Sequence, residues 1–111
     1  MPKPRAVYWI DYQRGPAWPA GQPAPEPALQ DHQIYLQQLM ETGKLLIAGL
    51  FQDTAGGGIA VLDCSNEVAA RQMMEDDPGV RAGLLTATLR PWQMVFNPAS
   101  GTSPFARDVA G

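Results

Sequence analysis

The stretch LQDHQIYLQQLMETGKLLIAG, residues 29–49, predicts a helix, a glycine that ends it and a short buried strand. Gly43 suits the left-handed position that commonly closes a helix, and the run LLIAGLF that begins at Leu45 has the length of a strand. One face of the helix carries side chains at helical spacing and is expected to pack inward: Leu29, His32, Leu36 and Leu39.

His32 is the only histidine of the chain. A titratable ring on the apolar side of a helix is either a core residue whose polar atoms are satisfied or part of a pocket lining. The helical pattern leaves both interpretations open, and the first is the commoner outcome for a lone histidine. The rest of the sequence has to supply a reason to prefer the second.

The composition describes one small globular domain, with 111 residues, 45% of them hydrophobic, and a net charge of −3. No basic cluster suggests binding to nucleic acid. No apolar run of about 18 residues and no long apolar signal core is present, so we expect a cytoplasmic protein that does not enter a membrane. Cys64, the only cysteine, cannot form an internal disulfide. The sequence shows no metal-binding or cofactor motif, so no metal and no cofactor are expected.

Residues 6–12, AVYWIDY, are rich in β-branched and aromatic side chains and predict the first strand. Asp11 lies at its end and is a candidate substrate-binding carboxylate or a strand-end aspartate in solvent. Five prolines in residues 13–27 exclude a central strand or a helix interior. This segment, which carries Arg14 and Trp18, is expected to be an extended surface loop or a lid over the start of the helix.

Three glycines at 56–58 predict a hairpin turn into a strand at 59–62, because glycine tolerates positive φ. A second helix then runs to about Glu75, with an inward face that we expect to include Val68, Ala69 and Met73. Asp77 precedes Pro78 and is therefore expected to leave the helix in an extended conformation. Its carboxylate can then point into the body of the domain.

Residues 83–96 predict the last long strand, in which Pro91 marks an edge, a bulge or a break. We expect one domain over residues 1–96 and a tail over 97–111. The order strand, helix, strand, strand, helix, strand is the split β-α-β plan (βαββαβ), an α+β, ferredoxin-like fold. Two helices cover one face of such a sheet, and a second copy of the chain is the economical cover for the other, which predicts a homodimer and leaves a higher oligomer open.

The sequence resembles the YCII-related (YciI-like) family, whose members are dimeric α+β barrels built from ferredoxin-like subunits. The resemblance spans roughly residues 7–96. Two departures affect the expected pocket: Leu50 replaces a frequent proline, and the loop before His32 is unusually rich in proline. The residues that carry the resemblance fall in family order: His32, Leu36, Leu39, Gly43, Leu45, Ala48, Gly49, Asp77, Pro78, Arg90, Pro91, Trp92 and Phe96.

The resemblance implies that His32 and Asp77 form a catalytic dyad in a pocket between helix and sheet. An aspartate bonded to one imidazole nitrogen fixes the tautomer and makes the other nitrogen a better base. A lone base of this kind suits proton abstraction followed by elimination or isomerisation. Candidate substrate-binding residues are Tyr35, Arg90, Asp11 and Arg14.

We therefore expect a cofactor-free lyase or isomerase that acts on a small acidic or phenolic molecule. The alternative is a non-catalytic module, a dimer that binds a small molecule or supports a partner. A structural dimer without a ligand would have the same fold. Contact between His32 and Asp77 is the feature that separates the first hypothesis from the others.

Overall fold

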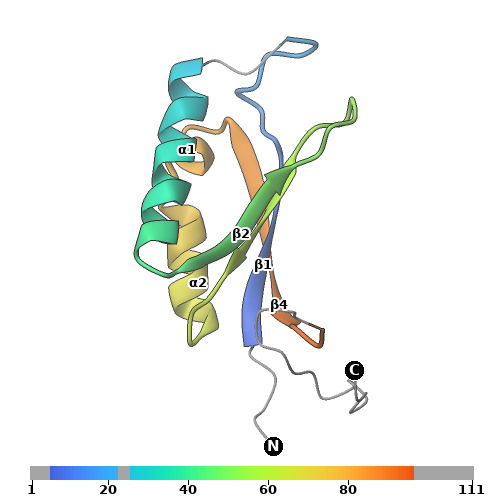
Figure 1. Cartoon of the computed structure of the whole chain (residues 1–111). Helices are drawn as coiled ribbons and strands as arrows, with labels where there is room; N and C mark the ends of the chain where they lie inside the picture. The colour runs from blue at the N-terminus through green and yellow to red at the C-terminus, as the bar shows by residue number, and fades with distance from the viewer. Residues whose placement is uncertain (1–5, 23–25, 97–111) are drawn as a thin grey trace, which may run out of the picture.

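The computed structural model describes residues 6–22 and 26–96, which form a four-stranded antiparallel sheet with helices on one face (Figure 1). The strand order β2-β3-β1-β4 is that of the ferredoxin-like fold, so the predicted α+β class is confirmed. The predicted tail, 97–111, lies outside the described residues. In chain order, the elements are β1 (Ala6–Arg14), α1 (Glu26–Glu41), β2 (Leu45–Leu50), β3 (Gly58–Leu62), α2 (Glu67–Glu75), α3 (Pro78–Arg81) and β4 (Leu85–Gln93).

Helix α1 begins at Glu26, three residues before the predicted start, because Pro27 lies in its first turn, where proline needs no hydrogen-bond partner. It ends at Glu41, and Gly43, two residues later, has φ +78°, the left-handed conformation predicted for it. The N–H of Lys44 donates to the carbonyl of Leu39 at 2.8 Å, and the N–H of Gly43 donates to Met40 at 3.0 Å. This pair of bonds is a Schellman motif, and it turns the chain directly into β2.

The core lies between the helices and the facing side of the sheet. Helix α2 contributes Ala70 and Met74 to it, whereas Val68, expected to point inward, is 80% exposed. The prediction was wrong for Val68, whereas Met73 packs against the core as expected. A nine-residue helix with two adjacent alanines does not fix its own rotational phase from sequence. All four strands of the sheet contribute to the core, chiefly with Ile10, Tyr12, Leu45, Ala60, Leu62, Leu85, Ala87 and Leu89.

Pro91 lies inside β4 and pairs with Tyr8 of β1. Of the three placements open to this proline, the structure shows the edge, because β4 is an outer strand of the sheet and one of its sides needs no hydrogen-bond donors. On the sheet face away from the helices, Trp9 and Trp92 pack edge-to-face with ring centroids 5.2 Å apart. Within the described residues, no helix is long and apolar enough to cross a membrane.

Candidate active site

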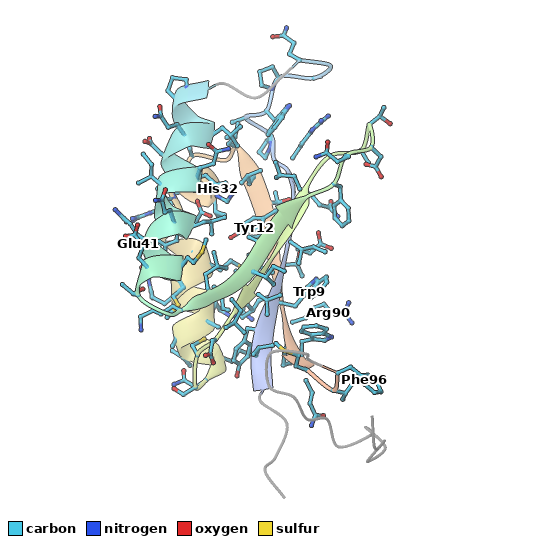
Figure 2. The ribbon with its side chains drawn as sticks, viewed as in Figure 1. Trp9, Tyr12, His32, Glu41, Arg90 and Phe96 are labelled. Carbon is cyan, nitrogen blue, oxygen red and sulfur yellow. The ribbon has the colours of Figure 1, made fainter. Side chains whose placement is uncertain are left out.

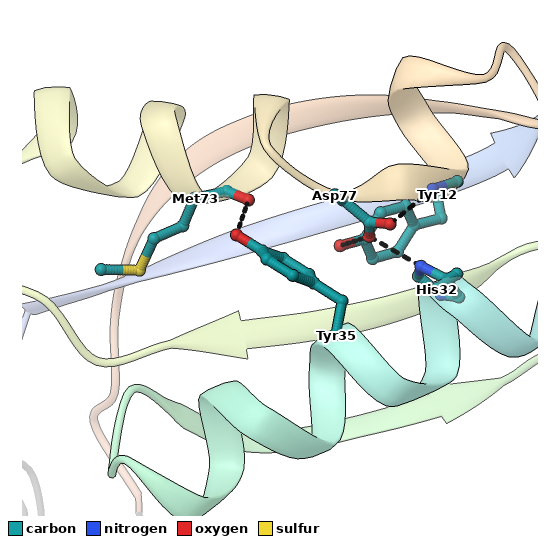
Figure 3. A network of polar contacts seen from close by, with 6 residues as sticks. Tyr12, His32, Tyr35, Met73 and Asp77 are labelled. Atoms are coloured by element: carbon teal, nitrogen blue, oxygen red, sulfur yellow. Dashed lines mark hydrogen bonds and ion pairs between the residues drawn. The ribbon is translucent and has the colours of Figure 1, made fainter.

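The candidate site is built around His32, near the middle of α1, and Asp77, between α2 and α3 (Figure 3). Nδ1 of His32 lies 2.6 Å from Oδ2 of Asp77. Asp77 has φ −62° and ψ 123°, the extended conformation expected before a proline, and it is completely buried. The sequence-based expectation that these two residues meet therefore agrees with the structure, while their catalytic role stays a prediction.

The hydrogen bonds of Asp77 define the state of the ring. Oδ1 accepts the backbone N–H of Gly79 at 2.8 Å, and Oδ2 accepts the hydroxyl of Tyr12 at 3.3 Å as well as the imidazole. With both oxygens acting as acceptors, Nδ1 of His32 must carry the proton that it shares with the carboxylate. The neutral ring then has its lone pair on Nε2, the nitrogen that can act as a base.

His32 also lines a cavity of about 240 Å³ between α1 and the sheet. Figure 2 shows the His32 side chain on the side of α1 that faces the sheet. Nε2 makes no hydrogen bond to the described residues, and no fully buried side-chain nitrogen or oxygen among them lacks a partner. Nε2 therefore reaches the cavity. The lining is mostly apolar and consists of Tyr12, Arg14, Trp18, Leu29, His32, Gln33, Leu36, Ala48, Gly49, Leu50, Gly57, Gly58, Ile59 and Leu85.

Tyr12 is a member of the site that the sequence analysis did not single out. Its ring packs edge-on against the His32 ring, with centroids 5.1 Å apart, and its hydroxyl donates to Asp77. Burial, and secondly the nearby Asp77 charge, raise the pKa of Tyr12 far above its usual value of 10.0. Tyr12 therefore remains a hydrogen-bond donor wherever the protein is folded. A buried tyrosine needs a polar partner, and this requirement was the available clue.

Tyr12 should make the protein less stable in alkali. Above pH 10 the unfolded chain loses the Tyr12 proton while the folded chain keeps it, so the free energy of unfolding falls as pH rises. The expected contribution is up to about 1.4 kcal/mol per pH unit. In Tyr12→Phe, denaturant unfolding between pH 9 and 11 should show a shallower decline than in the wild type. Equal slopes would contradict this assignment.

Of the other predicted substrate-binding residues, only Arg14 lines the cavity. The hydroxyl of Tyr35 donates to the Met73 carbonyl at 2.7 Å and ties α1 to α2. Arg90 pairs with Trp9 in the sheet, and Figure 2 shows both on the side away from the helices. Asp11 lies two residues after Trp9 in β1, so its side chain points to the same face of the sheet. These three residues therefore lie outside the cavity lining, and their substrate-binding role stays a prediction.

The described residues of the site do not form a metal-binding cluster. Within residues 6–22 and 26–96, no group of three or more His, Cys, Asp or Glu side chains is placed to hold a metal ion. Cys64 is partly buried away from the cavity, and burial raises the pKa of its thiol, which disfavours the reactive thiolate. What the site offers chemically is a single oriented imidazole beside an apolar cavity.

Comparison with known proteins agrees with this fold. The sequence matches the YCII-related domain over residues 14–93. No curated protein is similar enough in sequence to match. Among solved structures, the chain is similar to 5-chloro-2-hydroxyhydroquinone dehydrochlorinase from Burkholderia phenoliruptrix AC1100 in complex with 2,5-dihydroxybenzoquinone, with a TM-score of 0.56 and 16% identity over 78% of this chain and 93% of that chain. Because the domain match covers most of the chain, this protein belongs to the YCII-related family.

Proposed function

We propose that this protein is a small lyase or isomerase in which His32, oriented by Asp77, acts as a general base on a small acidic or phenolic molecule. The observation that carries the proposal is the 2.6 Å contact between Nδ1 and the buried carboxylate, made by a ring that also lines a cavity. A base positioned in this way needs no cofactor to remove a proton.

The reaction would begin when Nε2 of His32 takes a proton from an acidic C–H or O–H group of the bound molecule. The carboxylate of Asp77 stabilises the imidazolium that forms. In an elimination, the electron pair left on the substrate expels a leaving group as an anion, and the imidazolium then returns its proton to water. In an isomerisation, the imidazolium delivers the same proton to another carbon of the substrate.

The cavity limits the size and character of the substrate. A cavity of about 150 Å³ can hold benzene, so about 240 Å³ has room for one substituted ring. The apolar lining favours a flat, mostly apolar molecule, and its polar groups would be met by His32 and Arg14. The structural neighbour is named for its action on a compound of this kind, a chlorinated hydroxyhydroquinone.

Chloride release from 5-chloro-2-hydroxyhydroquinone is the first test of this proposal. His32→Asn keeps an amide N–H near the position of Nδ1 but has no counterpart of Nε2. We expect it to fold and to release chloride at least about 10²-fold more slowly than the wild type, since this is the usual contribution of a positioned base. Gln37→Asn changes an exposed side chain of the same helix that lies outside the cavity lining, and it serves as the control. Equal release by wild type and His32→Asn would refute the general-base role.

A second candidate function is a non-catalytic module that binds a small molecule. It is favoured by the small number of reactive side chains in the cavity. In the described lining, only His32 and Arg14 carry or can take up positive charge. The same assay separates the two candidates. A wild-type protein that binds the compound, seen as a raised melting temperature, without releasing chloride would support the binding module.

We also propose a homodimer formed through the sheet face that the helices leave uncovered. Trp92 is 42% exposed on that face beside Trp9, and an aromatic pair of this kind is typical of an interface core. Light scattering at micromolar concentration should give twice the chain mass of 12.0 kDa. The interface should bury more than about 1,000 Å². A mass of one chain would contradict the dimer and the closed barrel with it.

A further inference from the structure

We infer that Arg14 is a specificity residue that binds an anionic oxygen of the ligand at the mouth of the His32 cavity, a carboxylate being the best geometrical match. The inference rests on the proposed function in one respect, that this cavity is where the ligand binds. Arg14 is exposed at the end of β1 and contributes to the cavity lining together with His32.

The guanidinium of Arg14 is held between two surfaces. Its central carbon lies 4.9 Å from the ring centroid of Trp18, a cation–π contact. On the hairpin between β2 and β3, a Cβ added to Gly56 would lie 2.8 Å from both Nε and Nη2 of Arg14. Any larger residue at position 56 would therefore displace the guanidinium. Glycine at this turn therefore leaves room for the guanidinium and also tolerates the backbone φ of +69°.

The segment that presents Trp18 is itself fixed to the sheet. The N–H of Gly15 donates to the Leu84 carbonyl at 2.8 Å, and the N–H of Ala17 donates to Gly83 at 2.9 Å. The indole N–H of Trp18 donates to the Gln22 carbonyl at 2.9 Å, which fixes the ring on which Arg14 stacks. The guanidinium is therefore ordered before any ligand arrives, so binding loses less conformational entropy.

The charge of Arg14 has no protein partner within the described residues, where no carboxylate lies within ion-pairing distance of it. No other residue of the described cavity lining is an aspartate, a glutamate, a lysine or an arginine. A planar guanidinium presents parallel N–H groups that match the two oxygens of a carboxylate. The apolar walls strengthen such a contact. These properties point to a ring-sized acid whose anionic group binds Arg14 while the rest of the molecule extends toward His32.

The inference can be tested with a matched pair of probes, 4-hydroxybenzoate and its uncharged amide, 4-hydroxybenzamide. Isothermal titration should show that the wild type binds the acid about tenfold more tightly, as expected for a charge-assisted hydrogen bond. Arg14→Gln should bind both probes equally. Gly56→Ala should reduce the preference although it removes no charge. Arg81→Gln, at an exposed arginine of α3 outside the cavity lining, should retain the full preference.

Repeating the titration in His32→Asn separates this inference from the proposed function. If the acid is preferred in that variant and chloride release is absent even in the wild type, the anion site stands and the general-base role fails. The inference is overturned if Arg14→Gln keeps the preference for the acid. It is also overturned if the wild type binds the two probes equally or binds neither. Thermal melting of each variant shows whether a lost preference reflects a lost fold.

Discussion

Replacing Asp77 by asparagine is expected to lower turnover by about 10²- to 10⁴-fold while the protein stays folded. The introduced amide has the size of the carboxylate, and its oxygen can keep the hydrogen bond from the Gly79 N–H, now 2.8 Å from Oδ1. Its NH₂ group then faces Nδ1 of His32. Because two donors cannot face each other, the ring must place its proton on Nε2, and the cavity loses its base.

The matched control is Asp76→Asn. It removes the same charge one residue away, where the exposed carboxylate accepts a surface hydrogen bond from Gln72 at 2.9 Å. Chloride release by this variant should stay within about threefold of the wild type, because a surface charge has a small effect across solvent. If Asp77→Asn released chloride as fast as Asp76→Asn, Asp77 would have no role in orienting the base.

Gly15→Ala is expected to destabilise the fold by about 1–3 kcal/mol, the usual cost of overpacking. An added Cβ would lie 2.3 Å from the carbonyl oxygen of Gly83 and 3.1 Å from the backbone carbon of Leu84. Backbone cannot rotate away from such a clash as a flexible side chain can, so the segment that carries Trp18 must move off the sheet. We expect a lower midpoint in urea together with weaker binding of 4-hydroxybenzoate.

Gly49→Ala provides the comparison for this experiment. The same methyl group added at Gly49 meets no atom within 4 Å, and the residue lies in a strand without positive φ. It should be neutral or slightly stabilising, because alanine loses less backbone entropy on folding than glycine. A loss of stability in Gly49→Ala equal to that in Gly15→Ala would show that the close approach of Gly15 to Gly83 has no energetic importance.

The dyad could be predicted because a local rule positions each of its members. Helical spacing places His32 on the stripe of leucines that packs against the sheet. Pro78 forces Asp77 out of helical geometry, so the chain leaves α2 at this residue and the Asp77 carboxylate turns inward. The order of strands and helices then brings the two helix-borne residues to one face of the sheet. Family resemblance and local sequence rules therefore led to the same pair.

The other site residues could not be predicted from the sequence, because their location depends on which face of the sheet the helices cover. The first strand, AVYWIDY, carries aromatic side chains on both faces, so its pattern alone does not distinguish them. Asp11, a predicted substrate-binding residue, lies on the face of Trp9, whereas Tyr12, one residue later, contacts the dyad. The cation–π contact of Arg14 likewise requires a loop whose path is set by backbone bonds to Gly83 and Leu84.

The central claim is that His32 presents an unprotonated Nε2 to the cavity because Asp77 holds the proton on Nδ1. As the only histidine, His32 gives a single pair of imidazole signals in a ¹⁵N NMR spectrum of the labelled protein. With the ring neutral, we expect a protonated Nδ1 and an unprotonated Nε2 in the wild type, and the reverse in Asp77→Asn. A wild-type ring that carries its proton on Nε2, or that averages between both tautomers, would contradict the claim.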